Sequence, residues 1–196
     1  MANPGCHATG FISCVYPLVA AGILPKDFPL TAYSLTGYSG GGKKLIAEYE
    51  DAERDVRHES HRIYGTNLKH KHLPEMKAVC GLEKEPVFSP ILGDFYKGMA
   101  TTILLPGFNA EEVHAVLAKH YEGQALVSVA PLGGDESVIY ASTLAGHDSL
   151  RIIVCGREDQ TTVTALFDNL GKGASGAAVQ NMNIMLGFDP TQGLNK

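Results

Sequence analysis

A cysteine follows a Pro-Gly turn close to the beginning of the sequence, in the stretch MANPGCHATGF. The residues after Cys6 are mostly apolar and predict a helix, so the thiol falls at the N-terminus of that helix. The partial positive charge of a helix N-terminus lowers the pKa of a thiol, and the thiolate is the nucleophilic form. Cysteine is also a common small core residue, and spacing alone favours that packing role. The chemistry of Cys6 therefore depends on what the rest of the chain brings to it.

Histidines and lysines alternate in a second stretch, YGTNLKHKHLPE, which runs from Tyr64 to Glu75. If residues 68–72 are extended, His70 and His72 share one face, because side chains alternate along a strand. Imidazoles there could move protons, and the neighbouring lysines could hold an anionic substrate. The spacing also suits two metal ligands, but no third ligand is placed beside them, so we expect no metal. An exposed loop of mixed charge is the alternative interpretation.

Two glycine-rich stretches precede predicted helices. The first, Ser39-Gly40-Gly41-Gly42-Lys43, could cradle a phosphate, although it departs from the P-loop pattern and could be an ordinary flexible turn. The second, Lys172-Gly173-Ala174-Ser175-Gly176, would let a helix approach a ligand or simply pack tightly on its neighbours. Neither stretch identifies a ligand by itself.

Composition excludes several classes of protein. The chain has 196 residues, of which 44% are hydrophobic and 19% charged, as in a globular protein, and its net charge of -5 gives no electrostatic footprint for nucleic acid. No apolar run reaches the ~20 residues that span a bilayer, and the first ten residues do not look like a signal peptide. The four scattered cysteines argue against a zinc site or a disulfide framework and for a reducing, cytoplasmic location.

The elements needed to position these residues alternate along the chain. We expect helices over 8–21, 43–53 and 175–186, a short one opening at Pro74-Glu75, and one capped by Asn109. We expect strands over 29–36, 86–92, 98–105, 125–130, 137–142, 150–155 and 161–167, with 62–69 extended. This order predicts the α+β class, with a mixed, largely antiparallel sheet covered by helices.

Four motifs occur in one order: NPGC, SGGGK, HKHLPE and GKGASGAAVQNMN. Together they resemble the N-acetyl-gamma-glutamyl-phosphate reductases of arginine biosynthesis, from residue 3 to about residue 183. His7-Ala8-Thr9 and Thr36-Gly37-Tyr38 resemble the shorter subtype of that family. The chain departs from the family pattern at Gly41-Gly42-Lys43, where Ala-Gly-Arg is commoner, so a point charge replaces a planar guanidinium.

The resemblance implies NADPH-dependent reduction of N-acetyl-glutamyl 5-phosphate to the semialdehyde through a thioester on a catalytic cysteine, here Cys6. It makes His70 the general acid/base. Tyr64, His72 and Glu75 match positions that bind or orient the substrate. NADP(H) would lie near Ser39, Gly40, Gly173, Ser175 and Gly176. Cys14, Cys80 and Cys155 are then packing residues.

The resemblance also implies how the chain is organised. Residues 1–170 would form a catalytic and oligomerisation domain like that of glyceraldehyde-3-phosphate dehydrogenase-like enzymes, and residues 171–196 a helix that packs on a nucleotide-binding domain. No G-x-G-x-x-G fingerprint precedes NPGC, so we expect a truncated form that is inactive alone and a homo-oligomer, a dimer or tetramer. The alternatives are a non-catalytic oligomerisation module and a related aspartate-semialdehyde dehydrogenase.

Overall fold

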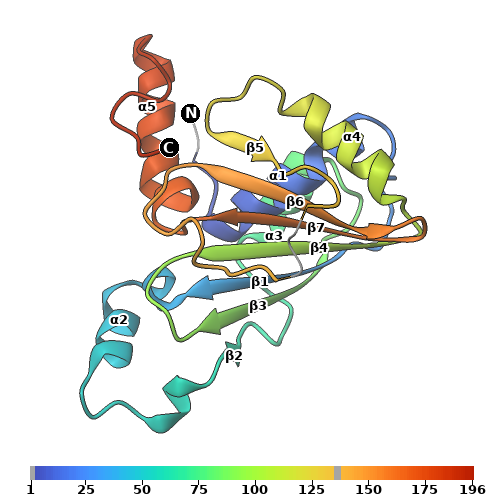
Figure 1. Ribbon diagram of the computed structural model, residues 1–196. Coiled ribbons are helices and arrows are strands. Elements are labelled where there is room, and N and C mark those ends of the chain that lie inside the picture. The colour runs from blue at the N-terminus through green and yellow to red at the C-terminus, as the bar shows by residue number, and fades with distance from the viewer. Residues whose placement is uncertain (1–2, 135–137) are drawn as a thin grey trace.

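The computed structural model describes residues 3–134 and 138–196, which form a seven-stranded sheet with helices packed on it (Figure 1). The strand order is β2-β3-β1-β4-β7-β6-β5. The strands are β1 Thr31–Gly37, β2 Arg62–Ile63, β3 Val87–Gly93, β4 Met99–Pro106, β5 Val127–Val129, β6 Leu150–Arg157 and β7 Gln160–Phe167. The α-helices are α1 Cys6–Ala20, α2 Gly42–Glu50, α3 Leu73–Cys80, α4 Ala110–His120 and α5 Gly176–Leu186. Shorter helical turns are η1 Tyr38–Gly41, η2 Val56–Glu59 and the π-helical η3 Gly171–Ser175.

Strand pairing confirms the predicted fold class. The pairs β2–β3, β1–β4, β4–β7 and β6–β7 are antiparallel, whereas β1–β3 and β5–β6 are parallel. The connection from β1 to β3 is a long crossover that contains α2 and α3, and β5 is joined to β6 by the segment 130–149. The sheet is therefore mixed and largely antiparallel.

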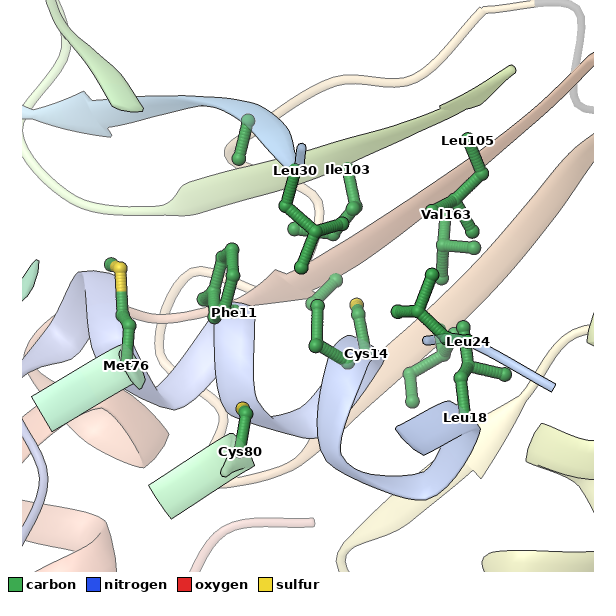
Figure 2. Packing of buried hydrophobic residues seen from close by; sticks show 14 of the residues in the cluster. Phe11, Cys14, Leu18, Leu24, Leu30, Met76, Cys80, Ile103, Leu105 and Val163 are labelled. Carbon is green, nitrogen blue, oxygen red and sulfur yellow. The ribbon is translucent and has the colours of Figure 1, made fainter. Parts of the chain in front are cut away.

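Helix α1 is apolar because it is buried against the middle of the sheet. It packs on β4 and β7, with α3 and α4 beside it. Figure 2 shows Phe11 and Cys14 of α1 in the same cluster as Ile103 of β4 and Val163 of β7, all with 0% exposure. A side chain at Gly10 would meet the Thr101 side chain, so glycine lets α1 approach β4 closely. This packing fixes the beginning of α1 over the start of β4 and the end of β7, which are antiparallel neighbours.

Two predicted helix signals are confirmed. Asn109 caps α4, since its Oδ1 accepts a hydrogen bond of 3.1 Å from the backbone N–H of Glu112. Pro74 lies in the first turn of α3, with Glu75 beside it at the positive end of the helix.

The predicted extended stretch 62–69 is wrong beyond its first two residues. Only Arg62–Ile63 forms a strand, and residues 68–72 form turns. Gly65 and Leu68 have positive φ angles of 60° and 55°, and the N–H of Leu68 closes a turn onto the carbonyl of Gly65. A left-handed residue breaks an extended backbone, so the shared-face argument for His70 and His72 fails even though both reach one site.

The predicted strand 137–142 is also wrong for the residues that can be judged. Residues 138–142 form a bend and turns, and residue 137 lies outside the described residues. The apolar alternation there places Val138 and Tyr140 in solvent, with exposed fractions of 62% and 69%. Alternation alone does not make a strand where no neighbouring strand offers pairing.

The helices found in the described residues are too short or too polar to cross a membrane.

Candidate active site

A cavity of about 620 Å³ opens where four separate segments of the chain meet. They are the N-terminal turn of α1, the η1–α2 glycine stretch, the loop from β2 to α3, and the segment after β7. Its lining includes Gly5, Cys6, His7, Ser39, Gly40, Arg62, Tyr64, His70, Lys71, His72, Asn169 and Gly173. The fold thus brings all four sequence motifs to one place.

Cys6 is the first residue of α1, as predicted, and follows the extended N-cap residue Gly5. The effect on its thiol differs from the sequence prediction. Burial raises the pKa of Cys6, and this outweighs the lowering by backbone N–H groups of the helix turn and by the positive charge of Lys71. The expected lowered pKa is therefore wrong for the chain in this state, because burial of the thiol has a larger effect than the helix N-terminus and Lys71.

His70 and His72 both line the cavity, and their rings meet edge to face with centroids 4.8 Å apart. The backbone N–H of His72 donates to Nδ1 of His70 at 3.2 Å, so a neutral His70 carries its proton on Nε2. The ring of His72 lies against Gly5, the residue before Cys6. Burial lowers the pKa of both imidazoles, that of His72 to about 4.

His72 has a feature that His70 lacks. Its Nδ1 is buried and has no hydrogen-bond partner within the described residues, so this nitrogen is available to accept a proton. The structure therefore adds His72 to His70 as a candidate for the acid/base role.

His7 connects the sheet to the cavity. Its Nδ1 lies 2.8 Å from Ser34 Oγ in β1, and its Nε2 lies 2.7 Å from Tyr64 Oη. The ring is 3% exposed, and burial, with the positive potential of His70, His72 and Lys71, lowers the pKa of His7 to about 3. Burial and the proximity of Cys6 raise the pKa of Tyr64, so its hydroxyl stays protonated. At neutral pH His7 is an uncharged bridge.

Glu75 contributes a structural contact outside the lining residues. Its Oε2 accepts a hydrogen bond of 3.2 Å from the backbone N–H of Gly5, which ties α3 to the N-cap of α1. This contact fits an orienting part in the site, and direct substrate binding by Glu75 remains a prediction.

The residues predicted near the cofactor divide into two groups. Ser39, Gly40 and Gly173 line the cavity, and a Cβ at Gly173 would lie 3.1 Å from Cys6 Cβ, so glycine keeps space open beside the sulfur. Ser175 and Gly176 are not part of the lining, and Gly176 is buried where a side chain would meet Asp148. Their part in cofactor binding remains a prediction.

Asn169 and Arg62 are site residues that the sequence argument missed. Asn169 donates to Ser39 Oγ at 2.9 Å and accepts from the Gly98 N–H at 2.8 Å, which fixes the glycine stretch to the start of β4. The Arg62 guanidinium lies 5.7 Å from the Tyr49 ring centroid and lines the cavity with Lys71. Arg62 could have been predicted as a site residue, because it is a cation two residues before Tyr64. No local sequence pattern predicts Asn169.

The other cysteines differ from Cys6 in their surroundings. Cys14 and Cys80 are buried in the core, where burial raises the pKa of both thiols, that of Cys80 to about 12. Cys155 is partly exposed on β6. Within residues 3–134 and 138–196, no group of three His, Cys, Asp or Glu side chains is arranged to hold a metal ion.

Comparison with known proteins identifies a matching family and individual relatives. A family described as "Semialdehyde dehydrogenase, dimerisation domain" matches residues 6–169. The chain is 47% identical to proteins named N-acetyl-gamma-glutamyl-phosphate reductase from Sinorhizobium fredii and Brucella ovis, in each case over 95% of the chain. It spans 63% and 64% of the length of these relatives, so less than two thirds of each.

Solved structures share the fold at low sequence identity. The aspartate semialdehyde dehydrogenase II of Vibrio cholerae matches with a TM-score of 0.71 and 16% identity. The match covers 95% of this chain and 62% of the Vibrio cholerae chain. A probable aspartate-semialdehyde dehydrogenase from Pseudomonas aeruginosa has a TM-score of 0.69 and 16% identity, covering 93% and 61%. These likenesses support the architecture and do not identify a substrate.

Proposed function

Because the chain belongs to the semialdehyde dehydrogenase dimerisation-domain family, we propose that it carries the catalytic cysteine of an N-acetyl-gamma-glutamyl-phosphate reductase. The proposed reaction is the NADPH-dependent conversion of N-acetyl-glutamyl 5-phosphate to N-acetyl-glutamate 5-semialdehyde. The observation that carries the proposal is the thiol of Cys6 at the first turn of α1, in one cavity with His70, His72 and Tyr64. The 47% identity to named reductases supports this substrate over aspartyl phosphate.

The first step is acyl transfer to sulfur. The Cys6 thiolate attacks the acyl carbon, the carbon–oxygen bond to phosphate breaks, and phosphate leaves with the bonding electron pair, which gives a thioester. The thiol proton passes to an imidazole, for which we propose His70 once its Nδ1 has released the backbone N–H of His72, with His72 as the alternative because its own Nδ1 is unpartnered among the described atoms. Both imidazoles have lowered pKa values and are neutral at pH 7, the state in which a base can accept the proton.

The cations at the cavity wall fit an anionic substrate. Lys71 and Arg62 both line the cavity, so they can attract the phosphate and carboxylate groups of an acylglutamyl phosphate. Lys71 also lowers the pKa of Cys6, although less than burial raises it. The charge of Lys71 would hold the phosphate near Cys6, whose sulfur displaces it from the acyl carbon.

NADP(H), the cofactor that this function requires, fits the open space beside Cys6. Ser39, Gly40 and Gly173 would hold its nicotinamide end, and the glycine at 173 provides the room that a Cβ would fill. When bound, the cofactor supplies the hydride that reduces the thioester carbonyl. Ser175 and Gly176 are proposed to act indirectly, through the π-helical turn that presents Gly173.

The rest of the chain suggests how the protein is assembled. The family description names a dimerisation domain, so we propose a homo-oligomer, a dimer or tetramer. Helix α5 projects from the body of the molecule in Figure 1 and exposes Met182, Met185 and Leu186, at 51%, 65% and 60%. We propose that residues 171–196 cover a nucleotide-binding domain with this face, and that the scattered cysteines, which have no CxxC pair, place the protein in the cytoplasm.

Acylation of the chain tests the proposal without the cofactor. N-acetyl-glutamyl 5-phosphate, generated with a kinase and ATP, is mixed with the 196-residue chain, and the acid-quenched peptides are analysed by mass spectrometry. We expect an N-acetylglutamyl group on Cys6, none on Cys14 or Cys80, and none in Cys6→Ser.

Beta-aspartyl phosphate, prepared in the same way, is the competing substrate. Acylation of Cys6 by aspartyl phosphate alone would transfer the assignment to an aspartate-semialdehyde dehydrogenase. An oligomer whose Cys6 takes up neither acyl group would instead be a non-catalytic module.

A further inference from the structure

A chain of four hydrogen-bonding side chains runs from the middle of the sheet to the cavity. Thr101 Oγ1 in β4 lies 2.8 Å from Ser34 Oγ in β1, which lies 2.8 Å from His7 Nδ1. His7 Nε2 lies 2.7 Å from Tyr64 Oη at the cavity wall. Thr101 and Ser34 are 0% exposed, so water does not replace any of these partners at the inner end.

The two possible directions of this chain are not equivalent. If Tyr64 donates to His7, each proton points inward and the Thr101 hydroxyl hydrogen ends without an acceptor, since Thr101 Oγ1 has no other partner among the described residues. Leaving a buried donor unpaired costs about 1–3 kcal/mol. If Thr101 donates to Ser34 and Ser34 donates to His7, each proton points outward and the Tyr64 hydrogen remains free for the cavity. The outward direction satisfies all the buried groups.

The charge state of His7 supports the same arrangement. A protonated imidazole donates from both nitrogens, which would force Ser34 to accept and would reverse the inner half of the chain. Burial and the nearby positive groups keep the pKa of His7 near 3, so the ring is neutral, and the buried Thr101 hydroxyl then selects the tautomer that accepts at Nδ1 and donates at Nε2. Tyr64 lies close enough to Cys6 for a charge on the sulfur to raise its own pKa.

We propose that His7 is a positioning residue that presents the Tyr64 hydroxyl as a hydrogen-bond donor to an oxygen of the acyl group on Cys6. The inference rests on the proposed function of Cys6 as the acylated nucleophile. When the thiolate attacks an acyl carbon, negative charge develops on the carbonyl oxygen, and a donor fixed in advance stabilises it. His7 fixes the donor, and Ser34 with Thr101 sets the direction of the proton.

Acylation by p-nitrophenyl acetate tests the proposal on the chain as it stands. Attack of Cys6 on this ester passes through the same kind of oxyanion and releases coloured nitrophenolate, with no cofactor. We expect Tyr64→Phe to slow acylation about 100-fold, which is the lower end of the range for loss of one oxyanion donor. His7→Phe should slow it equally, and the double variant should be no slower than either single one, because both remove the same donor.

Conservative replacement separates positioning from a merely structural role. His7→Gln keeps an N–H near the position of Nε2, so it should recover most of the acylation rate that His7→Phe loses. His114→Phe is the matched control, because His114 Nε2 has a 2.8 Å contact with the Ala130 carbonyl outside the cavity. It should leave the rate unchanged. Alkylation of Cys6 by iodoacetamide develops no oxyanion and should proceed at similar rates in all variants.

The outcomes distinguish this inference from the proposed function. Absence of acylation at Cys6 in the unsubstituted chain would overturn the proposed function. Normal acylation with additive effects of His7→Phe and Tyr64→Phe, or no rescue by glutamine, would overturn the positioning role alone. A ¹⁵N NMR spectrum that shows the His7 proton on Nδ1 would also overturn it.

Discussion

His7 Nε2 and Tyr64 Oη lie 2.7 Å apart although the two residues are separated by 57 positions in the sequence. His7 belongs to the first turn of α1, and Tyr64 follows β2 at the edge of the sheet. Their contact therefore joins the helix that carries the thiol to the loop that carries His70 and His72. Because His7 is buried and uncharged, the folded chain responds to pH in a way that can be measured.

Stability should fall as the solution becomes acidic. In the unfolded chain histidine binds a proton near pH 6.5, whereas His7 in the folded chain binds one only near pH 3, with His70, His72, Lys71 and Tyr64 facing it. Between these pH values the unfolded state holds more protons than the folded state. Each unit by which the pH falls therefore lowers the free energy of unfolding by about 1.4 kcal/mol for this group. Above the unfolded pKa the contribution is fully present.

Urea unfolding at several pH values measures this slope. His7→Gln should reduce the slope by about 1.4 kcal/mol per unit between about pH 4 and pH 6, since one titrating group is removed. Gln124→Asn, at an exposed position after α4, removes no titrating group and should leave the slope unchanged. Equal slopes for His7→Gln and the unsubstituted chain would contradict a buried neutral His7.

Cys6 should be alkylated faster than Cys14 and Cys80 in the folded chain. Both of those thiols are buried with raised pKa values, whereas Cys6 borders the cavity. The pKa of Cys6 is itself raised, so its rate should continue to increase as the pH rises above neutrality. Iodoacetamide labelling followed by peptide mapping should show at least about tenfold preference for Cys6 over these two residues. Equal labelling of Cys6 and Cys80 would contradict the predicted accessibility.

Lys71 should contribute to the reactivity of that thiol. Its charge lowers the pKa of Cys6, so Lys71→Met should slow alkylation at pH 8 about two- to fivefold, a modest effect because the lysine is exposed. Lys69→Met is the matched control, since Lys69 is not part of the cavity lining. The difference between the two variants should shrink in high salt, which screens exposed charges. An equal effect of both substitutions would show that Lys71 has no specific role.

His70 and His72 should have separable effects on acylation of Cys6. If His70 takes the proton, His70→Asn should lower the acylation rate about 10²- to 10⁴-fold, and the pH profile should lose the fall in rate on its acidic side, where a base becomes protonated. His72→Asn should then cause a smaller loss through the contact of His72 with Gly5. Single-turnover acylation by N-acetyl-glutamyl 5-phosphate across a range of pH distinguishes them. A larger loss in His72→Asn would transfer the base to His72, whose Nδ1 lacks a partner within the described part of the chain.

The sequence predicted the fold class and the meeting of four motifs better than it predicted local geometry. Apolar periodicity, an Asn cap and a Pro in the first turn located α1, α4 and α3 within a few residues. It failed at residues 68–72, because the positive φ of Leu68 has no strong sequence signal. It also failed on the pKa of Cys6, because desolvation depends on which distant segments close over the thiol.

In the site as well, the sequence predicted residues by their type and spacing but not residues that depend on long-range contacts. Cys6 and the two histidines of HKH could be selected by residue type and spacing, since their chemistry is intrinsic to them. Asn169 could not, because its value comes from two contacts, with Gly98 and Ser39, that only the folded sheet creates. The bridge from His7 to Ser34 was missed for the same reason, as β1 and β4 must pair before it exists.

A methyl group at position 5 should disturb the site without straining the backbone. Gly5 has φ −68° and ψ 155°, an extended conformation that alanine adopts freely, but its Cβ would overlap the ring of His72. Gly5→Ala should therefore displace His72 and weaken the Glu75 contact to the Gly5 N–H, lowering the rate of Cys6 acylation about tenfold or more. Gly134→Ala is the control, since its Cβ would meet only the Pro131 carbonyl at 3.5 Å. Histidine NMR signals and acylation rates measure both effects, and a Gly5→Ala protein with unshifted His72 signals would contradict the packing of this ring on the N-cap of α1.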